Sequence, residues 1–359
     1  MSGKRIIVVG AGIIGASIAW HLAKAGAEVI VVEAGETGGV ATRNSWAWIN
    51  ATWGNPETYF RLRTRSMAEW RRVDREVPGL DVSWCGGLIW DLPPEQLEAY
   101  AVEHSSWGYG IRRVDRKEAL RIEPNIKKPP DFVLHVAAEG KVEPLNAALA
   151  FLAGAEALGI TVLRDSHVKW LEEKNGRVVG ICINDGMLHA DEVVIAAGAG
   201  ASALLASIGL SFDIGAPAGL LVHSKPTGEI LHTLLMTPEL HVRQTAEGRL
   251  VAGADFAGSD PADDLPGSAA ALYQKVQDMV VGAEQVEMDF HTLGFRPTPG
   301  DGFPMIGRPQ NREGLYLTVM HSGITLAPAV GLFTAAELLD GKRDPLIGPY
   351  HPDRLLKAS

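Results

Sequence analysis

Cysteine is almost absent from the 359-residue sequence, which contains only Cys85 and Cys182. These two residues lie far apart, so they match no metal-binding or redox motif, in which cysteines stand close together. Disulfide-bonded proteins belong to oxidising compartments. The sequence therefore predicts a protein of a reducing, cytoplasmic environment that has no metal site.

An excess of positive charge is also lacking, since 33 Lys and Arg residues stand against 43 Asp and Glu residues, for a net charge of −10 at pH 7. Nucleic-acid binding requires a basic face that neutralises phosphates, so this composition argues against it. The densest basic group consists of Arg61, Arg63, Arg65, Arg71, Arg72 and Arg75. The same segment carries Leu62, Met67 and Trp70, and the spacing predicts an amphipathic helix with its arginines on the solvated side.

Long apolar runs are lacking as well. A fifteen-residue apolar-rich run ends at Trp20 and, because it follows Lys4 and Arg5, imitates a signal peptide. Three glycines interrupt this run and an amphipathic helix continues it, so we expect neither cleavage nor a membrane span. No other run is expected to reach membrane-spanning length. With 46% hydrophobic residues and no internal repeat, the chain should form a large core in two domains.

Residues 5–33 contain a strand, a glycine turn, a helix and a second strand with an acidic end. Gly10 permits a tight turn, Gly12 lets the backbone approach a pyrophosphate, and Gly15 allows the helix to pack closely on the strand. Amides at the helix N-terminus would face the phosphates, and Glu33 can accept the ribose hydroxyls. Glycines of an ordinary strand-to-helix turn are the alternative, but the flanking elements favour a dinucleotide-binding unit.

This unit is interrupted and later resumed. Residues 83–135 alternate short strand-like and helical runs with proline breaks, which is typical of an inserted segment. Residues 144–198 predict a helix, a strand, a hairpin turning at Asn175-Gly176, and a buried strand whose small end, Ala197-Gly198, leaves room for a nucleotide. Val168, in the strand that feeds the hairpin, is placed to touch an adenine. We predict a nucleotide-binding domain from residues 1–82, 141–215 and 290–359, and a substrate-binding domain from residues 83–140 and 216–289.

Two further motifs lie near the C-terminus, Gly294-Phe-Arg-Pro-Thr-Pro-Gly-Asp-Gly-Phe-Pro304 and His321-Ser-Gly-Ile-Thr-Leu-Ala-Pro328. Together with the N-terminal glycine turn, they make the chain resemble the FAD-dependent D-amino acid oxidase superfamily from end to end. The resemblance is to glycine oxidase and sarcosine oxidase-like amine oxidoreductases in particular. It implies an α/β fold in which a Rossmann-type FAD-binding domain carries an inserted substrate domain of antiparallel β-strands plus helices.

The resemblance assigns the FAD contacts to five places. They are the glycine turn with its helix start (Gly10, Gly12, Ile13, Ile14, Gly15), the acidic strand end (Glu33, Ala34), the loop beside the flavin ring (Thr42, Arg43, Asn44, Ser45, Ala47), the adenine side (Val168, Ala197, Gly198) and the C-terminal helix entry (Gly323, Ile324, Thr325, Leu326). A helix N-terminus at the last place would stabilise negative charge on the reduced ring. Members with covalent flavin use a cysteine in this C-terminal region, where this chain has none, so noncovalent FAD is expected.

Arg296 matches the arginine that pairs with the substrate carboxylate in glycine oxidase and its relatives. A guanidinium can hold a carboxylate by two parallel hydrogen bonds, although an acid of its own fold is an alternative partner. His241 stands where many relatives carry a substrate-facing tyrosine, and His321 lies near the flavin in a loop shorter than usual. Trp48, like Trp46, replaces a small or aliphatic residue of the flavin loop. For His241 and the two tryptophans, a role in the core alone is the alternative.

The resemblance implies oxidation of the C–N bond of a small amino acid, or of an N-substituted or cyclic one. Hydride transfer to flavin N5 would give an imino acid, and positioning and electrostatics would carry the catalysis. The electron acceptor is oxygen or another molecule, and the chain is open to forming an oligomer. Two alternatives remain, namely a flavoprotein of the same fold that oxidises a 2-hydroxy acid, and a flavoprotein subunit of a larger dehydrogenase complex.

Overall fold

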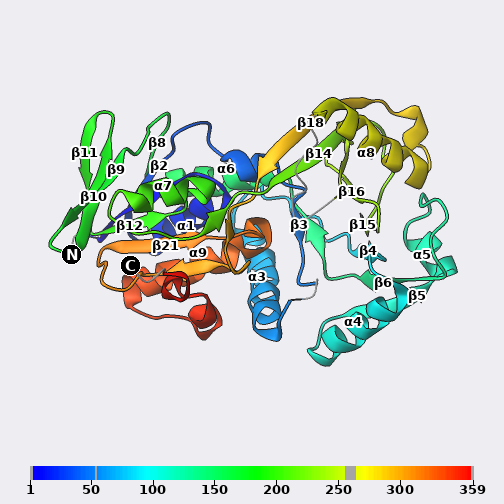
Figure 1. Ribbon diagram of the computed structural model, residues 1–359, viewed down its shortest axis with the longest axis horizontal. Coiled ribbons are helices and arrows are strands. Elements are labelled where there is room, and N and C mark those ends of the chain that lie inside the picture. The colour runs from blue at the N-terminus through cyan, green and yellow to red at the C-terminus, as the bar shows by residue number, and fades with distance from the viewer. Residues whose placement is uncertain (1–2, 53–54, 255–263, 357–359) are drawn as a thin grey trace.

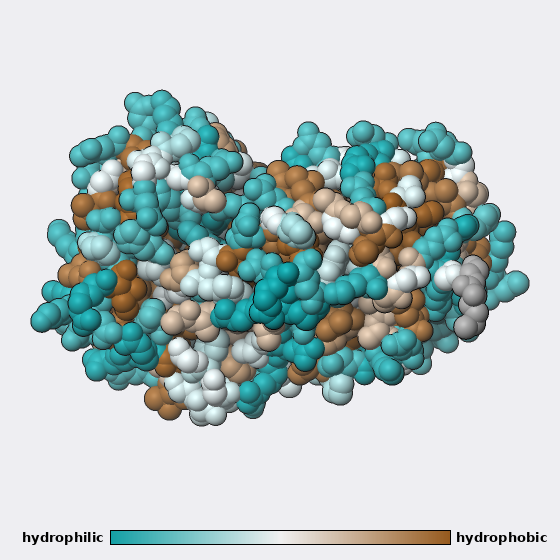
Figure 2. Space-filling model, turned by 180° about the vertical axis from the view of Figure 1, so that it is seen from behind, coloured by the Kyte–Doolittle hydropathy of each residue, from teal (hydrophilic) through white to brown (hydrophobic). Residues whose placement is uncertain are grey.

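The computed structural model describes residues 3–52, 55–254 and 264–356. Two large sheets organise these residues and lie in opposite halves of the molecule (Figure 1). Seen from behind, the two halves meet at a notch in the upper edge (Figure 2). The N-terminal strands, residues 161–206 and the C-terminal chain belong to one half, and residues 87–136 and 218–295 supply the sheet of the other (Figure 1).

The first sheet has six strands and is mostly parallel. Its order is β20 (Met305–Gly307), β21 (Leu315–Val319), β12 (Glu192–Ile195), β1 (Arg5–Val9), β2 (Glu28–Val32) and β8 (Thr161–Leu163). Only β20 runs antiparallel to its neighbour. Both faces of β1 are covered, since Ile6 and Val8 pack in one apolar cluster while Ile7 and Val9 pack in another. Burial on both faces explains why this strand is continuously apolar.

Helices cover one face of this sheet, and a small sheet with a short helix covers the other. The first layer consists of α1 (Ile13–Lys24), α3 (Glu57–Glu76), α6 (Pro144–Ala157) and α9 (Gly323–Asp340), with α1 packed against both α6 and α9. The second layer consists of α7 (Ala201–Ala206) and the antiparallel strands β9 (Trp170–Lys174), β10 (Arg177–Ile183) and β11 (Gly186–His189). The predicted turn at Asn175-Gly176 joins β9 to β10, and both of its residues have positive φ.

The second sheet has eight strands and joins two segments that are distant in sequence. Its order is β18 (Met288–Phe295), β14 (Ala218–Ser224), β17 (Leu250–Gly253), β16 (His241–Gln244), β15 (Leu234–Met236), β4 (Gly87–Ile89), β6 (Phe132–Val136) and β5 (Ile111–Asp115). The two segments meet where β4 and β15 pair in parallel, and the other pairs are antiparallel. Helix α8 (Leu265–Met279) packs its Leu272 and Val276 into the apolar cluster of this sheet, while α4 (Pro94–Ser106) and α5 (Arg116–Ile122) lie near β5.

Two short strand pairs accompany the large sheets. Strand β3 (Trp48–Ile49) pairs with β7 (Gly140–Lys141), and β13 (Ile214–Gly215) pairs with β19 (Thr298–Pro299). The remaining elements are α2 (Val40–Arg43) and the short 3-10 helices Gly198–Gly200, Ala283–Gln285, Pro345–Tyr350 and Pro352–Leu355. The predicted α/β fold with an inserted antiparallel sheet is confirmed. The domain boundaries stay a prediction.

Three local predictions are corrected. Arg63 does not lie on the solvated side of α3, because its side chain is buried. Val168 precedes β9 and is not part of a strand. We expected no further apolar run of membrane-spanning length, but helix α9 is long and apolar enough to cross a membrane. Since 67% of this helix is buried and it packs on α1 and α3, it has the surroundings of a core helix.

Candidate functional site

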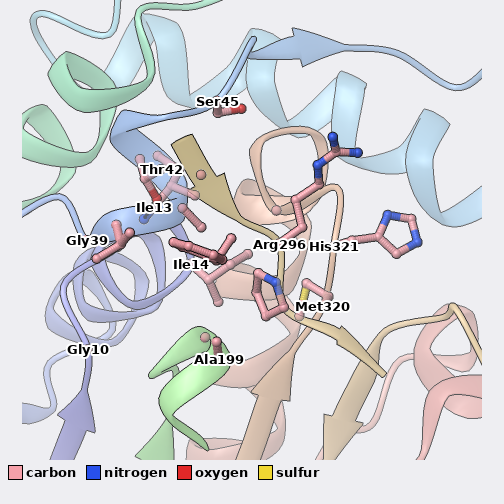
Figure 3. A pocket seen from close by; sticks show the side chains of 18 of the residues that line it. Gly10, Ile13, Ile14, Gly39, Thr42, Ser45, Ala199, Arg296, Met320 and His321 are labelled. Atoms are coloured by element: carbon pink, nitrogen blue, oxygen red, sulfur yellow. Dashed lines mark hydrogen bonds between the residues drawn. The ribbon is translucent and has the colours of Figure 1, made fainter. Parts of the chain in front are cut away.

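A cavity of about 1140 Å³ lies where the two sheets approach each other. This volume slightly exceeds the usual range for small-molecule and cofactor sites, about 300–1,000 Å³. Its walls come from the carboxyl ends of β1 and β2, from the start of α9 and from strands of the second sheet, and Figure 3 shows part of this lining. Ligands of open α/β sheets bind at this end of the strands.

Most of the residues predicted from the sequence line this cavity. They are Gly10, Gly12, Ile13, Ile14, Glu33, Ala34, Thr42, Asn44, Ser45, Ala47, Trp48, Val168, Ala197, Gly198, His241, Arg296, His321, Gly323, Ile324 and Thr325. Three predicted residues do not line it, namely Gly15, Arg43 and Leu326.

The three exceptions have clear physical reasons. A Cβ atom on Gly15 would lie 1.9 Å from the carbonyl oxygen of Gly10, so this glycine serves the close packing of helix on strand. The Arg43 guanidinium turns to the carboxylate of Glu36 and to the carbonyl of Thr37. Leu326 is fully buried, and its amide donates to the carbonyl of Ser322 at 3.1 Å.

The glycine turn forms one end of the cavity. Gly10 has φ +104°, and a Cβ atom there would lie 2.5 Å from the Ala196 carbonyl oxygen. The first turn of α1 carries no acidic residue, and the Ile13 amide donates to Thr42 Oγ1 at 3.0 Å. An N-terminus of this kind suits an anionic pyrophosphate. The Glu33 carboxylate is held in place by the amide of Ala11, which donates to Oε2 at 2.7 Å. These features fit the adenosine diphosphate part of FAD.

Arg296 and His321 lie at the other end of the cavity (Figure 3). Arg296 follows β18, and its amide donates to the Pro217 carbonyl at 3.1 Å. The guanidinium occupies space that Gly219 leaves open, because a Cβ atom on this glycine would lie 2.7 Å from Nη2 of Arg296. Any side chain at position 219 would therefore displace the guanidinium.

His241 is buried on β16 beside the Trp46 ring. Its imidazole lies 4.6 Å from the Trp46 ring, and a Cβ atom on Gly253 would lie 2.5 Å from its Nε2. Burial, together with the charge of Arg296, holds the pKa of His241 well below its usual value. The imidazole is consequently neutral at physiological pH.

His321 is also neutral, and its tautomer can be assigned. Its Nε2 lies 2.6 Å from the Gly302 carbonyl oxygen, which can only accept, so Nε2 carries the proton. Its Nδ1 then accepts from the Ser322 hydroxyl at 2.8 Å. Burial, and secondarily the charges of Arg63 and Arg296, lower the pKa of His321 to about 4.

Two indoles form a fixed apolar wall of the cavity. The Trp46 and Trp48 rings meet edge to face, with centroids 5.9 Å apart. Trp46 Nε1 donates to the Val251 carbonyl at 3.1 Å, and Trp48 Nε1 donates to Glu139 Oε2 at 2.8 Å. Burial raises the pKa of Glu139 to about 7. Both indoles therefore have partners that hold their orientation.

Arg63 is the main residue of the site that the sequence analysis missed. It lines the cavity, and its neighbours on α3 at helical spacing include the buried Tyr59, Met67 and Trp70. A helical wheel would have placed Arg63 on this apolar face, one turn from Tyr59 and one turn from Met67. Glu139 was missed too, and no local pattern in the sequence distinguishes it.

Comparisons with known proteins agree with this site. A family model described as FAD dependent oxidoreductase matches residues 5–337. Glycine oxidase of Bacillus licheniformis is 30% identical over 341 residues, covering 93% of this chain and 92% of that protein. One of the subunits of opine oxidase from Agrobacterium tumefaciens (strain Ach5) is 24% identical over 364 residues, covering 97% of this chain and 96% of that protein.

The solved structure of glycine oxidase from Geobacillus kaustophilus has the same fold, with a TM-score of 0.86 and 24% identity over 99% of this chain and 100% of that one. The match of the family model and the extent of the glycine oxidase similarity decide the assignment. The chain belongs to the family of FAD-dependent oxidoreductases typified by D-amino acid oxidase, and it is a flavoenzyme that acts on the C–N bond of amino acids.

Proposed function

We propose that this enzyme oxidises a small α-amino acid, primary, N-substituted or cyclic, whose carboxylate is bound by Arg296. The observation that carries the proposal is the placement of the Arg296 guanidinium in the cavity, in space that Gly219 leaves open. The glycine turn, Glu33 and the start of α9 then remain for the cofactor. Neither free cysteine, Cys85 or Cys182, lines the cavity, which supports noncovalent FAD.

The residues of the chain would act by binding and orientation. Arg296 can donate two parallel hydrogen bonds to a carboxylate and so fix the position of the α-carbon. His241 and His321 stay neutral, so they add no charge that would compete for the carboxylate. Trp46 and Trp48 exclude water from this end of the cavity, which strengthens the pairing with Arg296.

The FAD-binding set would comprise the lining residues of the glycine turn, the loop beside α2 and the first turn of α9. Bound FAD supplies the acceptor for the hydride of the substrate α-carbon, and the product is an imino acid that water hydrolyses. His321 keeps its proton on Nε2 through the bond to Gly302, and its basic Nδ1 already accepts from the Ser322 hydroxyl, so it is not a base for the substrate amine. We propose no catalytic base from the described residues.

An anaerobic substrate panel tests this function. The purified holoenzyme is mixed with glycine, D-amino acids, N-methyl amino acids and cyclic imino acids, and loss of flavin absorbance is followed. Carboxylate-bearing amines should bleach the flavin, whereas amines without a carboxylate should do so poorly. Bleaching by 2-hydroxy acids but by none of these amines would contradict the proposal.

A second candidate is a flavoprotein subunit of a larger dehydrogenase. The similarity to the opine oxidase chain of Agrobacterium tumefaciens, which extends over nearly the whole of both chains, favours this alternative. Turnover by the isolated chain with oxygen or an artificial dye separates the two candidates. A chain that reduces its flavin and then passes the electrons to oxygen works alone.

We also propose a cytoplasmic location, because Cys85 and Cys182 form no disulfide bond.

A further inference from the structure

Arg63 is a buried cation, and its hydrogen-bond partners among the described residues are all neutral. It is only 5% exposed, and it lines the cavity. Its Nε donates to the Asn50 carbonyl at 3.0 Å, Nη1 donates to Ser322 Oγ at 3.0 Å, and Nη2 donates to Asn50 Oδ1. A guanidinium has five N–H groups, so these bonds leave two donors for a group in the cavity.

No carboxylate oxygen of the described residues lies within ion-pair distance of Arg63. By contrast, the equally buried Arg243 pairs with Glu143 at 2.9 Å, and the partly buried Arg308 pairs with Glu192 at 2.6 Å. Glu139 is near enough to sense the charge of Arg63, but it hydrogen-bonds to Trp48 and Tyr109 instead. A buried charge without a counter-ion is unfavourable, so the position of Arg63 points to an anion in the cavity.

The anion must lie at the start of α9. Ser322, which binds both Arg63 and His321, is the residue that precedes this helix, and the first turn of α9 contains no acidic residue. Asn50, which accepts from Arg63, also connects to the first turn of α9, since its backbone amide donates to Thr325 Oγ1 at 3.3 Å. The partial positive charge of the helix N-terminus therefore adds to the full charge of Arg63.

We propose that Arg63 faces the pyrimidine side of the bound flavin and stabilises the negative charge that the ring gains on reduction. Two electrons and one proton, delivered together as the substrate hydride, convert the neutral oxidised ring into a reduced ring with one negative charge. A fixed cation favours that product, so Arg63 raises the reduction potential of the cofactor. The inference rests on the FAD assignment and leaves Arg296 for the substrate.

Three variants separate charge from hydrogen bonding. Arg63→Gln removes the charge but keeps an amide for Asn50 or Ser322, Arg63→Lys keeps the charge, and Ser322→Ala removes one bond to an unchanged Arg63. The matched control is Arg65→Gln on the same helix, because Arg65 has a 44% exposed side chain, pairs with Glu69 and does not line the cavity.

The readouts need no amino acid substrate, so they are independent of the proposed function. The reduction potential of the bound FAD is measured in each holoenzyme against a reference dye, and sulfite affinity is measured by titration. For Arg63→Gln we expect the equilibrium constant for two-electron reduction to fall at least tenfold, which equals a shift of about −30 mV. The sulfite Kd should rise by a similar factor, while Arg63→Lys, Ser322→Ala and Arg65→Gln should stay within roughly threefold of wild type.

Three results would overturn the proposal. The first is an Arg63→Gln holoenzyme with an unchanged potential, whether or not its KM for a substrate changes; a changed KM would place Arg63 beside the substrate. The second is a shift in Ser322→Ala as large as that in Arg63→Gln. If Arg63→Gln does not retain FAD, the proposal requires Arg63→Lys to retain it at the wild-type potential, and failure there is the third.

Discussion

Replacing Arg296 by alanine should lower kcat/KM for the best amino acid substrate by roughly 30- to 1,000-fold while FAD content stays normal. The loss corresponds to one charge-assisted, bidentate contact worth about 2–4 kcal/mol in a partly dry site. The structure supports the upper part of this range. His241 and His321 are neutral, and the two N–H groups of Arg63 that its bonds to Asn50 and Ser322 leave over are the ones that we assign to the flavin, so none of the three replaces the missing guanidinium.

Two variants sharpen the interpretation. Arg296→Lys should recover only part of the loss, because a point charge cannot reproduce the two parallel hydrogen bonds. Gly219→Ala keeps the charge but places a Cβ atom 2.7 Å from Nη2 of Arg296, so the guanidinium must move. A displacement of this kind should cost roughly 10- to 100-fold in kcat/KM.

The assay is steady-state turnover together with the anaerobic rate of flavin reduction, each normalised to FAD content. An amine that lacks the carboxylate should be a poor substrate of the wild type and should be nearly insensitive to Arg296→Ala. The reasoning is refuted by an Arg296→Ala enzyme with native FAD content and an unchanged kcat/KM for its best carboxylate substrate. Arg296 would then be structural, and the substrate class would rest on family membership alone.

Three further predictions concern the cofactor and the core. Gly12→Val should abolish FAD binding, because the valine side chain would enter the cavity. The control Gly35→Val should still bind FAD, because a Cβ atom at position 35 has no atom within 4 Å. Full FAD content in Gly12→Val, measured by absorbance, would contradict this prediction. Acid precipitation should release intact FAD into the supernatant, since no cysteine lines the cavity, and yellow precipitated protein would show a covalent bond. Burial raises the pKa of Glu139 from 4.5 to about 7, so the folded wild type holds a proton that the unfolded chain releases, and wild-type stability must fall as pH rises between these values. Relative to wild type, Glu139→Gln should therefore gain about 2.5 kcal/mol between pH 5 and 8 in denaturant unfolding, and a pH-independent difference would contradict the assignment.

The parts of the fold that the sequence predicted well depend on local chemistry. Gly10 must adopt a positive φ, and the Asn175-Gly176 turn needs two residues with positive φ in succession, so the residue types in both motifs predict the backbone conformation directly. In each case the decisive interactions join residues that are near in sequence.

The parts that escaped prediction depend on contacts between distant segments. The parallel pairing of β4 with β15 joins residues 87–89 to residues 234–236, and no sequence pattern encodes this pairing. Arg63 was grouped with the exposed arginines, although its helical position lies on the apolar face of α3, and its partner Ser322 is 259 residues away. The helix pattern can show which face Arg63 occupies, but the sequence of the helix does not contain the distant partners that allow its charge to be buried.

The charge of the cavity is independent of the charge of the chain. The chain carries a net charge of −10, but one end of the cavity combines Arg63, Arg296 and the N-terminus of α9 with two histidines that burial keeps neutral. Surface charges are screened over about 10 Å in dilute salt, whereas charges inside a water-poor cavity are screened much less. Discrimination in favour of a carboxylate-bearing substrate therefore has to arise inside the cavity. Two guanidiniums on separate elements, one after β18 and one on α3, allow the substrate anion and the cofactor anion to be stabilised by different residues.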